Sequence, residues 1–239
     1  MKKGRSLGGR YFHYGTALLI VQLLAGCSQA APEQNAVTNS SAASAPAPSA
    51  VAPDAKLIVA FGDSLFAGYN LEQDQGFAPA LERALSAQGI KARVFNAGVS
   101  GDTSAAGLQR LGFMLDGLDR KPDLVIVGLG ANDMLRGLSP EATRANLDAI
   151  LDALDKRGIP AMLTGMLAAP NMGADYASAF NPIYPDLAKK HGARLYPFFL
   201  DGVIGEPKLL LPDGIHPNDK GVELIVERVV PAVVADIAK

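Results

Sequence analysis

Short apolar runs alternate along the chain with longer stretches in which apolar residues recur at helical spacing. The apolar runs predict five strands, over 56–61, 93–95, 123–129, 161–166 and 194–196. The periodic stretches predict helices over 77–88, 104–118, 139–157 and 181–191, and a last helix from about residue 218. Ser139 as cap and Pro140 in the first turn mark the start of the third helix.

This alternation predicts an α/β domain built on one parallel sheet. Strands that are apolar along their whole length are buried on both faces, so helices must cover both sides of the sheet. Functional residues in such folds lie at the carboxyl ends of the strands. We therefore expect catalytic side chains directly after strands.

The N-terminal segment has a different pattern. Basic residues between positions 2 and 10 precede an apolar run at 17–21, and small residues follow, as in a secretory signal peptide. The apolar run is shorter than the about 20 residues that span a bilayer. The sequence Leu-Ala-Gly-Cys that ends at Cys27 resembles a bacterial lipobox. We expect a signal peptide over 1–26 and lipidation of Cys27; the alternative is an ordinary signal peptide with a cysteine near the cut.

Residues 28–53 predict a flexible tether. Ala, Pro and Ser occupy 18 of these 26 positions. These residues bury too little apolar surface to offset the conformational entropy that the segment would lose on ordering. We expect a tether over 27–53 and one folded domain over 54–239. Ser28 follows the cysteine, and in this the chain resembles lipoproteins that lack an aspartate there and are sent to the outer membrane. This resemblance implies a lipid-anchored protein of the cell envelope that faces the periplasm. The alternative is a periplasmic or secreted protein.

Composition excludes several classes of protein. Of the 239 residues, 49% are hydrophobic, too many for a disordered chain. A formal net charge of −2 gives no reason to expect nucleic acid as a partner. A single cysteine rules out an intramolecular disulfide and a multi-cysteine zinc site. Three histidines leave little material for binding a metal.

Four polar clusters follow predicted strands or precede the last helix. They are Gly62-Asp63-Ser64-Leu65, Asn96-Ala97-Gly98, Gly130-Ala131-Asn132-Asp133 and Asp213-Gly214-Ile215-His216. A serine after a strand is more often a helix cap than a nucleophile. The combination is more informative, because acyl transfer needs a nucleophile, a base, an orienting carboxylate and oxyanion donors, and these clusters contain all four.

The base is found by elimination among the histidines. His13 belongs to the leader, and His191 ends a predicted helix before Gly192, where a cation suits the helix dipole. His216 remains, and it follows Asp213 by three residues, close enough for the carboxylate to orient its ring. We expect Asp213 and His216 to act together.

Ser64 is the preferred nucleophile. Ser100 and Ser104 compete with it, but no Gly-x-Ser-x-Gly elbow occurs in the chain, and Gly62 permits a tight turn before Ser64. For the oxyanion we expect three N–H donors: the backbones of Ser64 and Gly98 and the side-chain amide of Asn132.

The four clusters, in this order and spacing, resemble the conserved blocks of the GDSL or SGNH hydrolase family over residues 57–230. Further stretches, among them Gly101-Asp102-Thr103-Ser104 and Ile183-Tyr184-Pro185, are similar to its bacterial arylesterases and multifunctional acyl-CoA thioesterase I/lysophospholipases. The resemblance implies a three-layer α/β/α flavodoxin-like fold and hydrolysis without metal or cofactor. It implies that Ser64 attacks, His216 serves as base and then acid, and Asp213 orients His216.

The substrate is less defined than the machinery. Six apolar residues near predicted strand ends are candidates for an acyl pocket: Phe66, Met134, Met166, Leu167, Met172 and Ile215. We expect the segment 168–179 to form a loop beside the site. The favoured function is a serine esterase acting on aryl or acyl esters, thioesters or lysophospholipids. The alternatives are a carbohydrate O-acetylesterase and a non-catalytic flavodoxin-like binding module.

Overall fold

The computed structural model describes residues 54–238, and these form an α/β domain around a five-stranded parallel sheet. The strands are β1 (Lys56–Gly62), β2 (Ala92–Gly98), β3 (Leu124–Gly128), β4 (Ala161–Thr164) and β5 (Arg194–Tyr196), in the order β2-β1-β3-β4-β5. Every pairing is parallel. The expected signal peptide, the tether and Cys27 lie outside the described residues.

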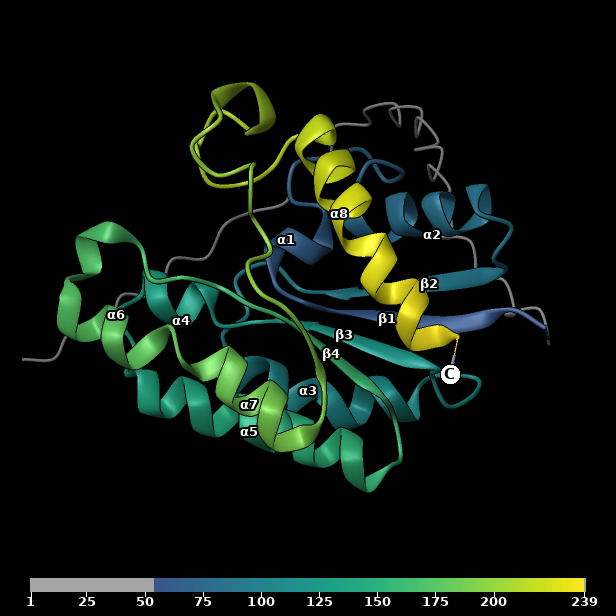
Figure 1. Ribbon diagram of the computed structural model, residues 1–239, viewed down its shortest axis with the longest axis horizontal. Helices are drawn as coiled ribbons and strands as arrows, with labels where there is room; N and C mark the ends of the chain where they lie inside the picture. The colour runs from purple at the N-terminus through teal and green to yellow at the C-terminus, as the bar shows by residue number, and fades with distance from the viewer. Residues whose placement is uncertain (1–53, 239) are drawn as a thin grey trace, which may run out of the picture. The chain divides into compact units, whose positions relative to one another are not determined.

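Helices cover both faces of the sheet, which gives the three layers that the resemblance implies (Figure 1). One face carries α2 (Phe77–Ala87) and α8 (Asp219–Ile237), and the other carries α3 (Ser104–Asp116), α5 (Pro140–Lys156) and α7 (Ile183–His191). The buried side chains of α5 (Leu147, Ile150, Leu151 and Leu154) have the predicted helical spacing. None of the helices between residues 54 and 238 combines the length and apolar character that a bilayer crossing needs.

Three glycines form a row across the carboxyl edge of the sheet. Gly62 at the end of β1 pairs with Gly98 of β2 and Gly128 of β3. A Cβ on Gly62 or Gly128 would lie 2.5 or 2.0 Å from the ring of Phe66, and a Cβ on Gly98 would lie 2.2 Å from the nitrogen of Ala67. The row therefore lets α1 (Ser64–Ala67) pack directly onto the strand ends.

Several boundaries differ from the prediction. β2 extends to Gly98 because its register with β1 continues through the polar Asn96. The segment expected as a loop over 168–179 contains a 3₁₀ turn, η1 (Pro170–Met172), and α6 (Ala174–Phe180). Pro182 separates α6 from α7, since it has no N–H to continue one helix into the next. The short helix α4 (Ala131–Leu135) and the turn η2 (Pro207–Leu209) were not predicted either.

Candidate active site

The structure brings Ser64, Asp213 and His216 together at the carboxyl edge of the sheet. Nε2 of His216 lies 2.8 Å from the hydroxyl oxygen of Ser64, and Nδ1 lies 2.7 Å from Oδ2 of Asp213. The serine begins α1, directly after β1, whereas the other two residues precede α8. This is the geometry of a nucleophile, a base and an orienting carboxylate.

The aspartate is held in its ionised form. Its Oδ1 accepts hydrogen bonds from the backbone N–H groups of His216 (3.0 Å) and Ile215 (2.9 Å). These bonds, that of His216 first, outweigh partial burial and lower the pKa of Asp213 to about 2. Because the carboxylate accepts from Nδ1, the proton of a neutral His216 resides there, and Nε2 is free to accept the proton of Ser64.

Backbone contacts fix the loop that carries the base. Leu210 and Pro217 form an antiparallel bridge, and the N–H of Leu211 donates to the carbonyl of His216 at 2.7 Å. Asn218 caps α8 by accepting from the N–H of Gly221, and its amide donates to the carbonyl of Lys208 at 2.9 Å. The base is therefore anchored on both sides by the start of α8 and the η2 turn.

Asp63 is a buried carboxylate that holds the turn carrying the nucleophile Ser64. Its carboxylate caps α1 by accepting from the N–H of Leu65 at 3.0 Å, and only 1% of the residue is exposed. Burial, with the negative charges of Asp102 and Asp133 adding to it, raises the pKa of Asp63 to about 7, against the opposing effect of the bond from Leu65. Asp63 therefore positions the turn at Ser64 and is the carboxyl of this site that titrates near neutrality.

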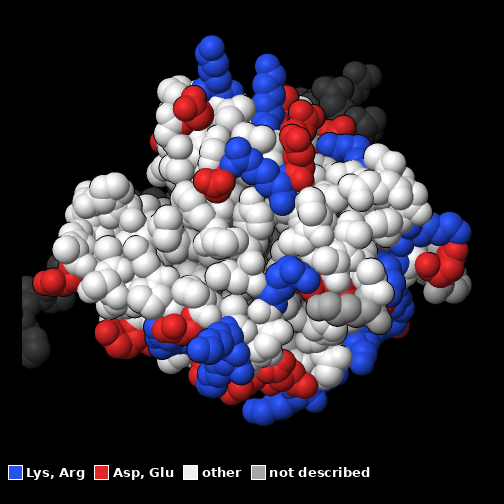
Figure 2. Space-filling view, in the orientation of Figure 1, with Lys and Arg blue, Asp and Glu red and all other residues white. Residues whose placement is uncertain are grey.

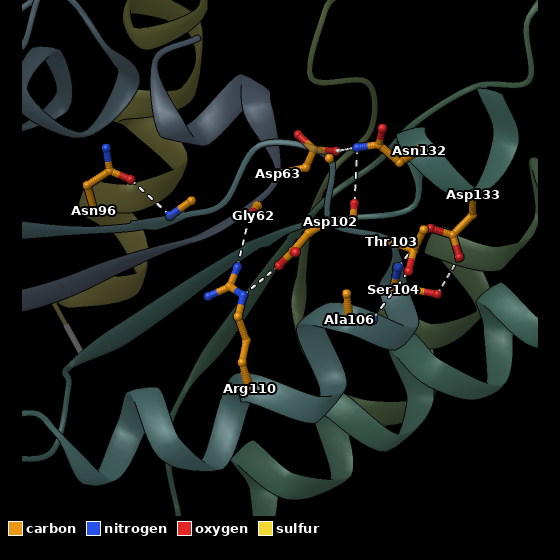
Figure 3. A network of polar contacts seen from close by, with 12 residues as sticks. Gly62, Asp63, Asn96, Asp102, Thr103, Ser104, Ala106, Arg110, Asn132 and Asp133 are labelled. Carbon is orange, nitrogen blue, oxygen red and sulfur yellow. Dashed lines mark hydrogen bonds and ion pairs between the residues drawn. The ribbon is translucent and has the colours of Figure 1, made fainter. Parts of the chain in front are cut away.

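Asn132, a predicted oxyanion donor, lies beside Asp102 and Asp63, and its role as a donor stays a prediction. The amide Nδ2 of Asn132 lies 3.0 Å from the carbonyl oxygen of Asp102 and 3.4 Å from Oδ2 of Asp63 (Figure 3). Asn132 lines the same cavity as Ser64 and His216. The backbone N–H of Ser64 begins α1, where no intrahelical acceptor exists, so it is a second donor.

The prediction for Gly98 is wrong. Its N–H already donates to the side-chain oxygen of Asn96 at 2.9 Å, and its packing against α1 accounts for the glycine. Gly101, three residues later, lines the cavity with a φ of +85°, and its N–H has no hydrogen-bond partner among residues 54–238. Gly101 therefore fits the third donor position better than Gly98 does, beside the N–H of Ser64 and the amide of Asn132. Sequence reasoning missed Gly101, although Gly101-Asp102-Thr103-Ser104 is part of the resemblance.

A largely apolar cavity of about 620 Å³ opens above Ser64 and His216. Four of the six predicted pocket residues line it: Met134, Met166, Leu167 and Ile215. Phe66 does not, because it is 1% exposed and stacks on Phe199 with ring centres 4.9 Å apart. Met172 packs against the core outside the cavity lining. The prediction missed five large apolar residues of the lining: Tyr69, Leu135, Phe198, Leu200 and Ile204.

Comparison with known proteins identifies the family. The model of the GDSL-like lipase/acylhydrolase family matches residues 60–224. The chain belongs to this family. It is 38% identical to Esterase TesA of Pseudomonas aeruginosa, over 74% of this chain and 87% of that protein. It is 36% identical to the arylesterase of Vibrio mimicus, over 75% of this chain and 88% of the relative.

Solved structures of the family agree. The crystal structure of AlinE4, an SGNH-hydrolase family esterase, matches with a TM-score of 0.66 and 52% identity, over 77% of this chain and 97% of that one. The crystal structure of TesA matches with a TM-score of 0.71 and 36% identity, over 76% and 99%. This GDSL hydrolase is thus a carboxylic ester hydrolase with a serine nucleophile.

The remaining histidine of the described residues serves elsewhere in this GDSL hydrolase. His191 contacts Asp155 through Nδ1 (2.6 Å) and Asp148 through Nε2 (2.7 Å). Asp148, Asp152 and His191 have potential metal-binding atoms within 4.8 Å of one another. Both ring nitrogens face carboxylates, so the group is an ion-paired cluster rather than a ligand set with a free lone pair. Figure 2 shows charged side chains of both signs gathered at the lower edge, over α5 and α7.

Proposed function

We propose that this esterase hydrolyses acyl esters with a medium or long acyl group through an acyl-Ser64 intermediate. The observation that carries the proposal is the 2.8 Å contact between Ser64 and Nε2 of His216, at one side of an apolar cavity. A polar site with the same machinery would suit a small acetyl group on a sugar; this cavity is built for hydrocarbon.

The reaction follows from the geometry. His216 accepts the proton of Ser64 as the serine oxygen bonds to the ester carbonyl carbon. The N–H groups of Ser64, Gly101 and Asn132 stabilise the oxyanion of the tetrahedral intermediate. His216 then donates its proton to the leaving alkoxide, which departs as an alcohol. Water, deprotonated by His216, attacks the acyl-serine, and collapse of the second intermediate releases the acid and restores Ser64.

The lining of the cavity favours an acyl substrate over a carbohydrate acetate. Five of its large apolar side chains are between 40% and 54% exposed: Tyr69, Leu135, Leu167, Ile204 and Ile215. Covering such surface with an alkyl chain releases about 25 cal/mol per Å². An acetyl group is too small to cover it. A bound sugar would leave hydroxyl groups against apolar side chains, which costs affinity.

The cellular location is part of the proposal. The Leu-Ala-Gly-Cys sequence at Cys27 supports lipid anchoring in the cell envelope, with residues 27–53 as a tether. Mass spectrometry of the mature N-terminus tests this. A diacylglyceryl-modified Cys27 is the expected result, and an unmodified N-terminus in a freely soluble mature protein would contradict it.

A series of p-nitrophenyl esters from acetate to palmitate tests the substrate class. We expect kcat/KM to rise from acetate toward longer chains, with lysophosphatidylcholine and palmitoyl-CoA assayed beside them to separate ester from thioester preference.

Ser64→Ala should abolish every activity while circular dichroism stays unchanged. Ser100→Ala, which alters another serine of the same cavity, is the matched control and should keep activity within about threefold. Hydrolysis of acetate alone would favour the carbohydrate esterase.

A further inference from the structure

Arg110 on α3 joins two loops that meet at the active site. Its Nε lies 2.5 Å from Oδ2 of Asp102, and its Nη2 donates to the carbonyl of Gly62 at 2.9 Å (Figure 3). The guanidinium also lies over the ring of Phe61, 4.3 Å from the ring centre. The side chains of Arg110 and Asp102 are only 23% and 12% exposed. Three contacts therefore hold this guanidinium in one orientation.

Both residues that Arg110 contacts are within two positions of a proposed oxyanion donor in the sequence. Gly62 precedes Ser64 by two residues, and Asp102 follows Gly101. The carbonyl of Asp102 also accepts from the amide of Asn132 at 3.0 Å. Through Gly62 and Asp102, one guanidinium is thus connected to all three donors.

We propose that Arg110 is the positioning residue of the oxyanion hole. It fixes the turn at Gly62 relative to the loop at Asp102, so that the donors converge on one point above Ser64. It acts through other residues, because it does not line the cavity. Donors stabilise an oxyanion only when held within about 0.5 Å of the productive geometry. The inference rests on the proposed acyl-transfer function.

The planar fork of arginine is what this role requires. One guanidinium presents several N–H groups in fixed directions, so it can hold a carboxylate and a carbonyl at once. Lysine offers a single nitrogen on a flexible chain and cannot keep both contacts with the same geometry. Arg110→Lys therefore keeps the charge and loses the fixed spacing.

Steady-state kinetics with p-nitrophenyl butyrate tests the role. We expect Arg110→Met to lower kcat about 10–100-fold with KM within about twofold, and Arg110→Lys to fall between it and the wild type. Arg157→Met is the matched control: Arg157 joins α5 to Asp116 of α3 at 2.6 Å, remote from the donors, and its loss should leave kcat unchanged. Melting temperatures check that each variant folds; if Arg110→Met does not, Arg110→Lys carries the test.

A double-mutant cycle separates positioning from general support of the fold. In an Asn132→Ala background, the proposal predicts that Arg110→Met lowers kcat by a smaller factor than it does in the wild type, since one of the three donors that Arg110 positions is already absent. Fully additive losses, or a wild-type kcat in Arg110→Met and Arg110→Lys, would overturn the inference while leaving the esterase function intact. An inactive wild-type enzyme would instead contradict the proposed function.

Discussion

Two histidines at opposite ends of the sheet each contact aspartate, and only one of them is available as a base. His216 presents one ring nitrogen to Asp213 and the other to the hydroxyl of Ser64. His191 has a carboxylate on each nitrogen, one from Asp148 and one from Asp155. The partner of the second nitrogen therefore decides whether an imidazole transfers protons or holds helices together.

The charge of His191 follows from its surroundings. Burial alone would lower its pKa, but hydrogen bonds with Asp148 and Asp155 outweigh burial and raise it. With only 4% of its side chain exposed, the protonated ring links the end of α7 to α5. Histidine thus serves as the catalytic base at one edge of the sheet, and at the other edge it forms ion pairs that hold α7 against α5.

Replacement of His216 gives the largest expected effect. His216→Ala removes the proton acceptor of Ser64, so kcat/KM should fall about 10⁴–10⁶-fold. The fold should be unchanged, because the loop is held by backbone contacts. Hydrolysis of p-nitrophenyl butyrate and a thermal melt measure both quantities. An active His216→Ala enzyme would show that His216 is not the base that accepts the proton of Ser64.

Asp213→Asn should cost less, about 10²–10⁴-fold in kcat, because the base remains but its orienting charge is lost. The pKa of about 2 means that the wild-type carboxylate stays ionised in mildly acid solution. Because its folded pKa is below 3.8, Asp213 stabilises the fold above that pH, and the contribution is lost as pH falls through 2. A pH–rate profile down to pH 4 checks this: an acid limb caused by Asp213 would contradict it.

Asp63→Asn should change how stability depends on pH. The folded pKa of about 7 exceeds 3.8, so the folded state holds the extra proton and wild-type stability falls as pH rises from about 4 to 7. The variant lacks this loss, which is at most about 4 kcal/mol for a shift of this size. Urea unfolding at pH 4, 6 and 8 measures the difference. Asp116→Asn is the control: it removes an exposed carboxyl of lowered pKa, whose contribution is complete above pH 3.8, so the slope between pH 4 and 8 should stay as in the wild type.

His191→Gln should have the smallest effect and should act on stability alone. We expect a loss of about 1–2 kcal/mol at pH 5.5, because two charge-assisted hydrogen bonds disappear. A raised folded pKa means that the stabilisation is complete below 6.5 and is lost as pH rises through the folded pKa. The variant should therefore differ less from the wild type at pH 9. A loss of kcat at constant stability would place His191 in the catalytic machinery.

The sequence predicts the parts of this molecule that depend on pattern. The strands follow from apolar runs, and Ser64 and Asn132 follow from their places after strands. Gly98 and Gly101 could not be told apart in this way, because the difference is that one N–H is bonded to Asn96 and the other is not. Phe66 follows the same strand end as Ser64, but the glycine row draws its ring into the core. These outcomes depend on three-dimensional packing rather than on residue type.

The sequence separation of 152 positions between Ser64 and His216 has a consequence for how activity arises during synthesis. The nucleophile is made early and its base late, and α8, which anchors the loop of the base, is the last described element of the chain. A growing polypeptide that has reached α7 contains the whole sheet except β5, yet it has no proton acceptor for Ser64. Hydrolysis therefore begins only after His216 and its anchor α8 have been made, and a product truncated before His216 has no proton acceptor for Ser64.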